Sequence, residues 1–124
     1  MLSPGAILVV DDDTALCYSL ALLLRRAGYT VTTASHPRQA LQCLQAQTYD
    51  LVFLDIKMPD IDGLALLSYI RRSYPQTAIL ILSAYTTPAL AAETIRRGAC
   101  ACLSKPLNPA DILTHVRNVL APAP

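Results

Sequence analysis

The chain has 124 residues, of which 53% are hydrophobic and 15% are charged, and its formal net charge is +1 at pH 7. This length suits one domain with a single core, and the apolar content argues against a disordered chain. The near-neutral charge provides no basic surface typical of nucleic-acid binding, so we expect no direct contact with nucleic acid. We expect the domain to span residues 1–121, with a tail or the start of a linker at residues 122–124.

Cysteine spacing and hydropathy indicate the compartment. The apolar run at residues 6–10 is short for a signal peptide, lacks a basic lead and ends in three aspartates. The most apolar helical stretch, residues 16–24, is too short to span a bilayer. The cysteines form no C-x-x-C pair and no disulfide framework, which favours free thiols in a reducing cytosol: Cys17, Cys43, Cys100 and Cys102. We therefore expect a cytoplasmic protein that does not enter a membrane.

Strand-like and helix-like patterns alternate from the N-terminus. Residues 7–10 form a continuous aliphatic run, which is typical of a parallel strand covered on both faces. The helix that follows carries a stripe of leucines and ends at Gly28. Residues 29–34 are β-branched and predict the second strand, after which Pro37 opens a second helix. Residues 50–54 predict the third strand.

The same alternation continues to the end of the chain. After an amphipathic third helix, residues 78–82 are aliphatic throughout and predict the fourth strand. Pro88 and Gly98 mark the start and the end of the fourth helix. Residues 100–103 predict a short fifth strand, and a last amphipathic helix opens at residues 108–109.

Five strand–helix units of this length predict an α/β fold. Such units bury their strands as a five-stranded parallel sheet with helices on both faces. Because crossovers are right-handed, helices cover both faces only if the strand order reverses somewhere. We expect the doubly wound, flavodoxin-like (βα)5 order 2-1-3-4-5, which places the ends of strands 1 and 3 side by side where ligands bind.

Carboxylates follow two of these neighbouring strands. Asp11, Asp12 and Asp13 end the first strand, and Asp55 ends the third. Crowded carboxylates raise at least one pKa unless a cation joins them, and hard carboxylate oxygens suit Mg²⁺. The pattern therefore predicts a divalent cation site. An aspartate before a helix can also be a simple N-cap, which is the favoured interpretation for Asp13. It does not account for Asp55, which follows four apolar residues.

A hydroxyl and an amine follow the other two strands at this edge. Ser83 ends the fourth strand and Lys105 follows the fifth. Each alone would be an ordinary turn or surface residue, but one polar group at each of four neighbouring strand ends predicts a phosphate clamp. Lys105 would act as a point charge and Ser83 as a neutral donor.

Four segments together resemble the receiver domains of two-component response regulators, with matching order and spacing over nearly the whole chain. The resemblance implies that Asp55 is the phosphoacceptor and that Mg²⁺ binds Asp12 directly and Asp11 mainly through water. It also implies that the backbone carbonyl of Lys57 is a further ligand. The segments that carry the resemblance are Ile7–Asp12, Leu54–Pro59 with Gly63, Ser83-Ala84 and Lys105-Pro106.

The resemblance also implies how the protein works. Asp55 would accept a phosphoryl group from a sensor histidine kinase or a phosphotransfer protein, in a Mg²⁺-dependent reaction. Ser83 would turn toward the phosphoryl group and Lys105 would hold one of its oxygens, while the Lys105-Pro106 bond would be cis. The signal would then pass through the helix 4–strand 5–helix 5 face to a downstream output domain or protein. Such a domain is not an enzyme beyond its own phosphorylation and dephosphorylation.

Three features depart from the family's usual pattern or modify its output. Cys102 stands where most receivers have Tyr or Phe, which predicts that Ser83 moves the following loop without that ring, with Tyr85 as the nearest aromatic candidate. Cys100-Ala101 replaces acidic residues that support a charged dimer, so we expect a monomer or a weak phosphorylation-dependent dimer. Lys57 and Tyr85 should flank the path of attacking water and slow dephosphorylation.

The same residues argue against three other functions. An aspartate-nucleophile phosphohydrolase prefers a second acid at the position of Lys57, and a flavin-binding electron carrier needs a Ser-, Thr- and Gly-rich loop where this chain has residues 11–13. A degenerate receiver that only binds a partner would not need the full set of polar residues. His36 and His115 have no partner at ligand spacing, and surface or half-buried packing is expected for both.

Overall fold

A computed structural model describes residues 5–58 and 61–120, which alternate between five strands and five helices. Each predicted strand is confirmed, and its limits are correct to within one residue. The elements are β1 (Ala6–Val10), α1 (Thr14–Arg26), β2 (Thr30–Ala34), α2 (Pro37–Ala46), β3 (Leu51–Asp55), α3 (Gly63–Ser73), β4 (Ala78–Ser83), α4 (Pro88–Arg96), β5 (Ala101–Ser104) and α5 (Pro109–Leu120). The predicted domain limits at residues 1 and 121, the tail at 122–124 and Pro59 lie outside the described residues.

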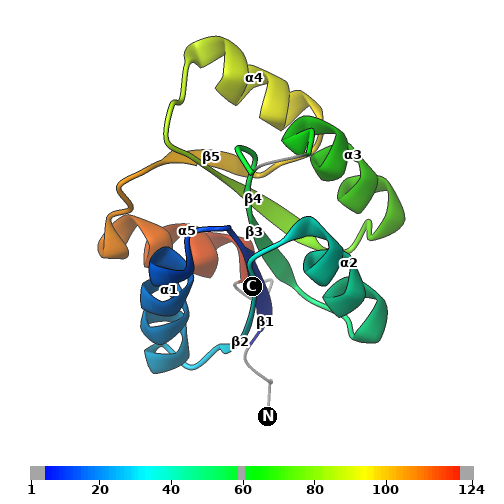
Figure 1. Cartoon of the computed structure of the whole chain (residues 1–124). Coiled ribbons are helices and arrows are strands. Elements are labelled where there is room, and N and C mark those ends of the chain that lie inside the picture. Colours follow the sequence, from blue (N-terminus) through cyan, green and yellow to red (C-terminus); the bar gives the residue numbers. More distant parts are fainter. Residues whose placement is uncertain (1–4, 59–60, 121–124) are drawn as a thin grey trace.

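The strands form one parallel sheet in the predicted order β2-β1-β3-β4-β5. Figure 1 shows α1 and α5 on one face and α2, α3 and α4 on the other. The two faces bury separate clusters, because alternate strand residues point to opposite sides. Ile7 and Val9 pack with the leucines of α1 and with Ile112 and Val116 of α5, whereas the intervening strand residues pack with α2 and α3.

The three central strands are apolar because both of their faces are covered. No residue of 7–10, 51–54 or 79–82 has any exposed surface. A charge inside such a run would be costly, so polar side chains are confined to the ends of the strands. This confinement, rather than any local motif, puts the chemistry at the edge of the sheet.

Side chains and glycines at the helix ends account for where the helices begin and stop. Asp13 caps α1 as expected, since its Oδ1 accepts a hydrogen bond from Leu16 N at 3.1 Å. Gly28 follows α1 with φ +102°, a conformation that side chains rarely adopt. His36 is exposed and caps α2, since its Nδ1 accepts from Arg38 N. No helix in the described part of the chain is long and apolar enough to cross a membrane.

Candidate functional site

The predicted polar residues meet at one edge of the sheet because of strand order and register. Val10 pairs with Leu54, so the residues that follow them, Asp11 and Asp55, lie at the same level on adjacent strands. Asp55 itself pairs with Leu82 of β4, which places Ser83 one residue beyond it. Lys105 directly follows the last residue of β5, the strand that pairs with β4, so Lys105 lies at the same edge of the sheet.

Asp11, Asp12 and Asp55 form an acid cluster at this edge. One oxygen from each carboxylate lies within 4.8 Å of the others. Asp11 is completely buried and Asp55 is 3% exposed, whereas Asp12 reaches solvent. Burial raises the pKa of Asp11 to about 6, and the negative charge of Asp55 adds to the rise. Ionising all three carboxylates together is therefore energetically unfavourable in this buried site.

Lys105 joins the two buried acids. Its Nζ lies 2.7 Å from Asp11 Oδ2 and 3.3 Å from Asp55 Oδ2. Burial alone would lower the pKa of Lys105, but contact with Asp11 and the charges of both acids outweigh it, so this pKa is raised. One ammonium group is therefore shared between two buried carboxylates. The lysine thus compensates only part of the acid cluster.

These residues fit a hard divalent cation. Three carboxylates converge, two of them are buried, and one ammonium group offsets only part of their charge. Oxygen-rich sites of this kind suit Mg²⁺ better than softer metals. Sulfur and imidazole ligands do not join this cluster among the described residues.

The loop after β3 is fixed against the acid cluster. The backbone N–H of Lys57 donates to Asp55 Oδ1 at 2.9 Å, which holds the Lys57 backbone beside this carboxylate. Gly63, the first residue of α3, lies so close to Ile56 that an added Cβ would be 2.2 Å from Ile56 O. The loop and the helix are therefore in direct backbone contact next to Asp55.

The turn between β1 and α1 holds the acids that it carries. Asp13 N donates to Asp11 Oδ1 at 2.9 Å, and Cys17 Sγ donates to the backbone oxygen of Asp11 at 3.2 Å. Burial and the charge of Asp11 raise the pKa of the Cys17 thiol to about 11, so it stays protonated and can donate. Sequence reasoning treated Cys17 only as a free thiol, and no local pattern reveals its contact with Asp11.

Ser83 is completely buried at the end of β4, and its Oγ accepts a hydrogen bond from Tyr85 N at 3.2 Å. The side chain of Tyr85 is 77% exposed. Cys102 is half-buried and packs against the cluster on the α4 side of the sheet, together with Leu90. Across the site, the Lys105-Pro106 peptide bond is cis, as the resemblance to receiver domains implied.

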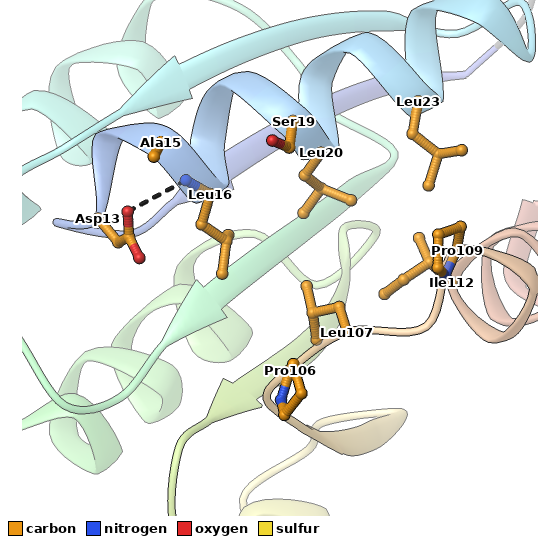
Figure 2. A pocket seen from close by; sticks show the side chains of 10 residues that line it. All are labelled: Asp13, Ala15, Leu16, Ser19, Leu20, Leu23, Pro106, Leu107, Pro109 and Ile112. Carbon is orange, nitrogen blue, oxygen red and sulfur yellow. Dashed lines mark hydrogen bonds between the residues drawn. The ribbon is translucent and has the colours of Figure 1, made fainter.

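An apolar groove lies beside the edge of the sheet that carries the acid cluster (the acid edge), between α1 and the loop that leads into α5. Its volume is about 350 Å³. Figure 2 shows Leu16, Leu20 and Leu23 of α1 pointing across the groove toward Leu107 and Ile112. Asp13 and Pro106 also line it, and they are the sequence neighbours of Asp12 and Lys105.

Comparisons with known proteins agree over most of the chain. The family model described as "Response regulator receiver domain" matches residues 7–117. The transcriptional regulatory protein ZraR of Escherichia coli (strain K12) is 40% identical over 115 residues, which cover 93% of this chain and 26% of that protein. The DNA-binding transcriptional regulator NtrC of the same strain is 32% identical over 117 residues, or 94% of this chain and 25% of that protein. The chain thus spans about a quarter of the length of these curated relatives.

Solved structures show the same architecture. A CheY-like response regulator receiver domain protein from Methanospirillum hungatei JF-1 superposes with a TM-score of 0.88 at 31% identity, covering 94% of this chain and 93% of that one. The chemotaxis protein CheY4 of Vibrio cholerae gives a TM-score of 0.88 at 33% identity, covering 94% of this chain and 99% of that one. Both likenesses cover almost the whole of this chain.

Proposed function

This chain belongs to the response regulator receiver domain family, and we propose that it is a phosphorylation-controlled signalling switch whose phosphoacceptor is Asp55. The observation that carries the proposal is the placement of Asp55. This carboxylate is 3% exposed, ends an otherwise apolar strand and lies next to two further acids and a lysine. Burying an acid there costs stability, and a phosphoryl-transfer role accounts for every neighbour that it has.

Asp55 acts as the nucleophile. Its carboxylate attacks the phosphorus of a phosphohistidine in line, so an O–P bond forms and the N–P bond breaks with its electron pair going to nitrogen; the imidazole takes up a proton from solvent and leaves neutral. Lys57 N holds Oδ1 and Lys105 Nζ approaches Oδ2, so both oxygens are oriented before the reaction. Lys105 then holds one oxygen of the transferred group. Water later hydrolyses the acyl phosphate at the same site.

The acid cluster gives this reaction its dependence on Mg²⁺. Asp12 would bind the ion directly and Asp11 mainly through water, with Asp55 and the Lys57 backbone carbonyl as further ligands. When bound, Mg²⁺ supplies positive charge that offsets the charge on the phosphoryl oxygens. The crowded, largely buried acids and the raised pKa of Asp11 support this assignment.

Ser83 would couple phosphorylation of Asp55 to a conformational change. Its hydroxyl oxygen accepts from Tyr85 N at rest, and the added phosphoryl group, with about −2 charge, would accept a hydrogen bond from the hydroxyl. Turning toward that group breaks the bond to Tyr85 and pulls the loop before α4. The α4–β5–α5 face then repacks as a population shift between two states. Because Cys102 replaces the usual ring, Tyr85 is the aromatic residue coupled most directly to Ser83.

We expect two classes of partner, one that donates the phosphoryl group and one that receives the signal. A sensor histidine kinase or a phosphotransfer protein would donate the phosphoryl group, and the apolar groove beside the acid edge is the surface that such a donor would contact. The α4–β5–α5 face would contact a downstream output domain or protein. Glu93 of α4 pairs with Arg96 of the same helix and with Arg97, which follows its last residue, so these charges are already paired within one chain. This favours a monomer or a weak dimer formed after phosphorylation.

The test is intact-mass measurement after incubation with MgCl₂ and acetyl phosphate. We expect the wild type to gain the mass of one phosphoryl group and Asp55→Asn to gain none. Asp50→Asn is a matched control, because Asp50 precedes the same strand at the opposite edge of the sheet and should leave phosphorylation intact. A wild type that stays unmodified, or an Asp55→Asn variant that is still modified, would contradict the proposal. The first outcome would favour a degenerate receiver that acts only as a binding module.

A further inference from the structure

Cys17 is a buried thiol that the proposed reaction does not use. It is 5% exposed and packs on the inner face of α1 with Leu20 and Leu24, where an apolar residue would fill the same space. Its Sγ nevertheless donates a hydrogen bond to the backbone oxygen of Asp11 at 3.2 Å. A thiol is a weak donor, but this bond is buried and ends on the residue that begins the acid cluster.

The bond completes a set of contacts that surround Asp11. The N–H of Asp11 donates to Ala34 O of β2 at 3.1 Å, and its carbonyl accepts from Cys17. Its side-chain Oδ1 accepts from Asp13 N at 2.9 Å. With the backbone held on both sides and Oδ1 engaged, Oδ2 is left facing Lys105 and the acid cluster.

The carbonyl of Asp11 belongs to the peptide that joins it to Asp12. A hydrogen bond to that oxygen therefore fixes the peptide plane from which the exposed carboxylate of Asp12 extends. The helix end is tied to the same turn, because Cys17 N donates to Asp13 O at 3.0 Å and Asp13 caps α1. Cys17 thus connects the body of α1 to the backbone between the two acids.

We propose that Cys17 is a positioning residue that orients Asp11 and Asp12 for divalent cation binding, an inference that rests on the proposed function. Without the thiol donor, the peptide between the acids gains freedom to rotate, and the carboxylates lose part of their common orientation. The cation then has to order the turn as it binds, which weakens its affinity. An alternative role in packing alone would depend on the volume of the side chain and not on its donor.

Three variants separate the two roles. Cys17→Val removes the donor and keeps a buried side chain of similar size. Cys17→Ser keeps a donor on a smaller side chain. Ala21→Gly lies one turn further along the same buried face of α1 and loosens the helix without touching the turn. The free energy of unfolding, measured with urea, shows how far each variant is destabilised.

The decisive measurement is calorimetric titration of the unphosphorylated proteins with MgCl₂. We expect Cys17→Val to bind Mg²⁺ about fivefold more weakly, the equivalent of one hydrogen bond. Cys17→Ser should recover most of this loss, and Ala21→Gly should bind like the wild type. In metal-free buffer the amide hydrogen of Asp13 should exchange faster in Cys17→Val than in Ala21→Gly, because its acceptor on Asp11 is less well held.

Two outcomes would overturn the positioning role and leave the proposed function intact: wild-type affinity in Cys17→Val, or equally weak binding in Cys17→Ser and Cys17→Val. A wild type that binds no Mg²⁺ would instead remove the cation site, and the inference would fall with it.

Discussion

Gly63→Ala should disturb both the stability of the fold and the site, because Gly63 touches the backbone after Asp55. A Cβ built on Gly63 would lie 2.2 Å from Ile56 O and 2.5 Å from Ile56 Cα, and real Cβ atoms essentially never come closer than 3.0 Å. These are backbone atoms, so no change of side-chain rotamer relieves the overlap. Either the start of α3 or the loop that carries Lys57 has to move by most of an ångström.

The cost of this movement can be approximated from overpacked cores, where added carbon atoms destabilise by about 1–3 kcal/mol. Alanine gains up to about 1 kcal/mol over glycine inside a helix, but less at the first helical position. We therefore expect the free energy of unfolding to fall by about 2 kcal/mol, measured by urea denaturation with the slope unchanged. Because Ile56 follows Asp55, the affinity for Mg²⁺ and the rate of phosphorylation by acetyl phosphate should fall as well.

Gly28→Ala is the matched control for this experiment. Gly28 has φ +102° and nothing within 4 Å of an added Cβ, so alanine there is strained without colliding. The strain should cost about 1–2 kcal/mol, but Gly28 ends α1 away from the acid edge and Mg²⁺ affinity should not change. Wild-type stability in Gly63→Ala would refute the steric reasoning. Equal loss of Mg²⁺ affinity in both variants would refute the local effect on the site.

Three further predictions concern other parts of the molecule. The double variant Lys57→Ala, Tyr85→Ala should lose its phosphoryl group faster than the wild type, because both side chains are exposed beside the site and restrict attacking water; equal phosphoryl lifetimes would reject this. Arg97→Ala should lower the free energy of unfolding by about 1–2 kcal/mol, since the guanidinium of Arg97 bonds to α3 as well as to its own helix. Arg96→Ala, on an exposed side chain, should change it by less than about 0.5 kcal/mol in urea unfolding, and equal effects would contradict the role of the α3 contact. In metal-free buffer the folded protein holds the Asp11 proton up to a pKa of about 6, above the ordinary 3.8, so stability due to this group should fall as the pH rises from about 4 to about 6. The unfolding free energy of the wild type relative to Asp11→Asn should therefore drop by roughly 2 kcal/mol over this range, and a constant difference would show that burial does not shift the pKa of this group.

The strands and their order could be predicted because burial on both faces leaves a simple pattern. Residues 7–10 and 79–82 are aliphatic and completely buried, which is typical of parallel strands covered on both faces. Once the order is fixed, chain connectivity alone brings the ends of β1 and β3 together. This is why Asp11, Asp12 and Asp55 could be expected to meet, and their oxygens lie within 4.8 Å of one another.

Contacts that end on backbone atoms could not be predicted in this way. The leucine stripe of α1 predicts which face is buried, but not that Cys17 reaches the carbonyl of Asp11. Likewise, the bond from Arg97 to the carbonyl of Leu64 spans 33 positions in the sequence. Side-chain patterns report which face an element buries, whereas such contacts depend on the exact crossing of two elements. His36 illustrates the same limit, because an exposed position could be expected but its hydrogen bond to Arg38 N could not.

The energy gained by burying the central strands is large enough to offset the cost of burying charged carboxylates in the acid cluster. Each fully buried aliphatic side chain of the central strands contributes about 1.5–3 kcal/mol. The raised pKa of Asp11, from 3.8 to about 6, corresponds to a penalty of roughly 3 kcal/mol at neutral pH, so one or two such side chains offset it. The fold therefore stays stable despite this penalty. A cation that neutralises the acid cluster would remove the penalty, which favours its binding. A substitution that removes an acid from the cluster should for the same reason stabilise the metal-free protein while it weakens cation binding.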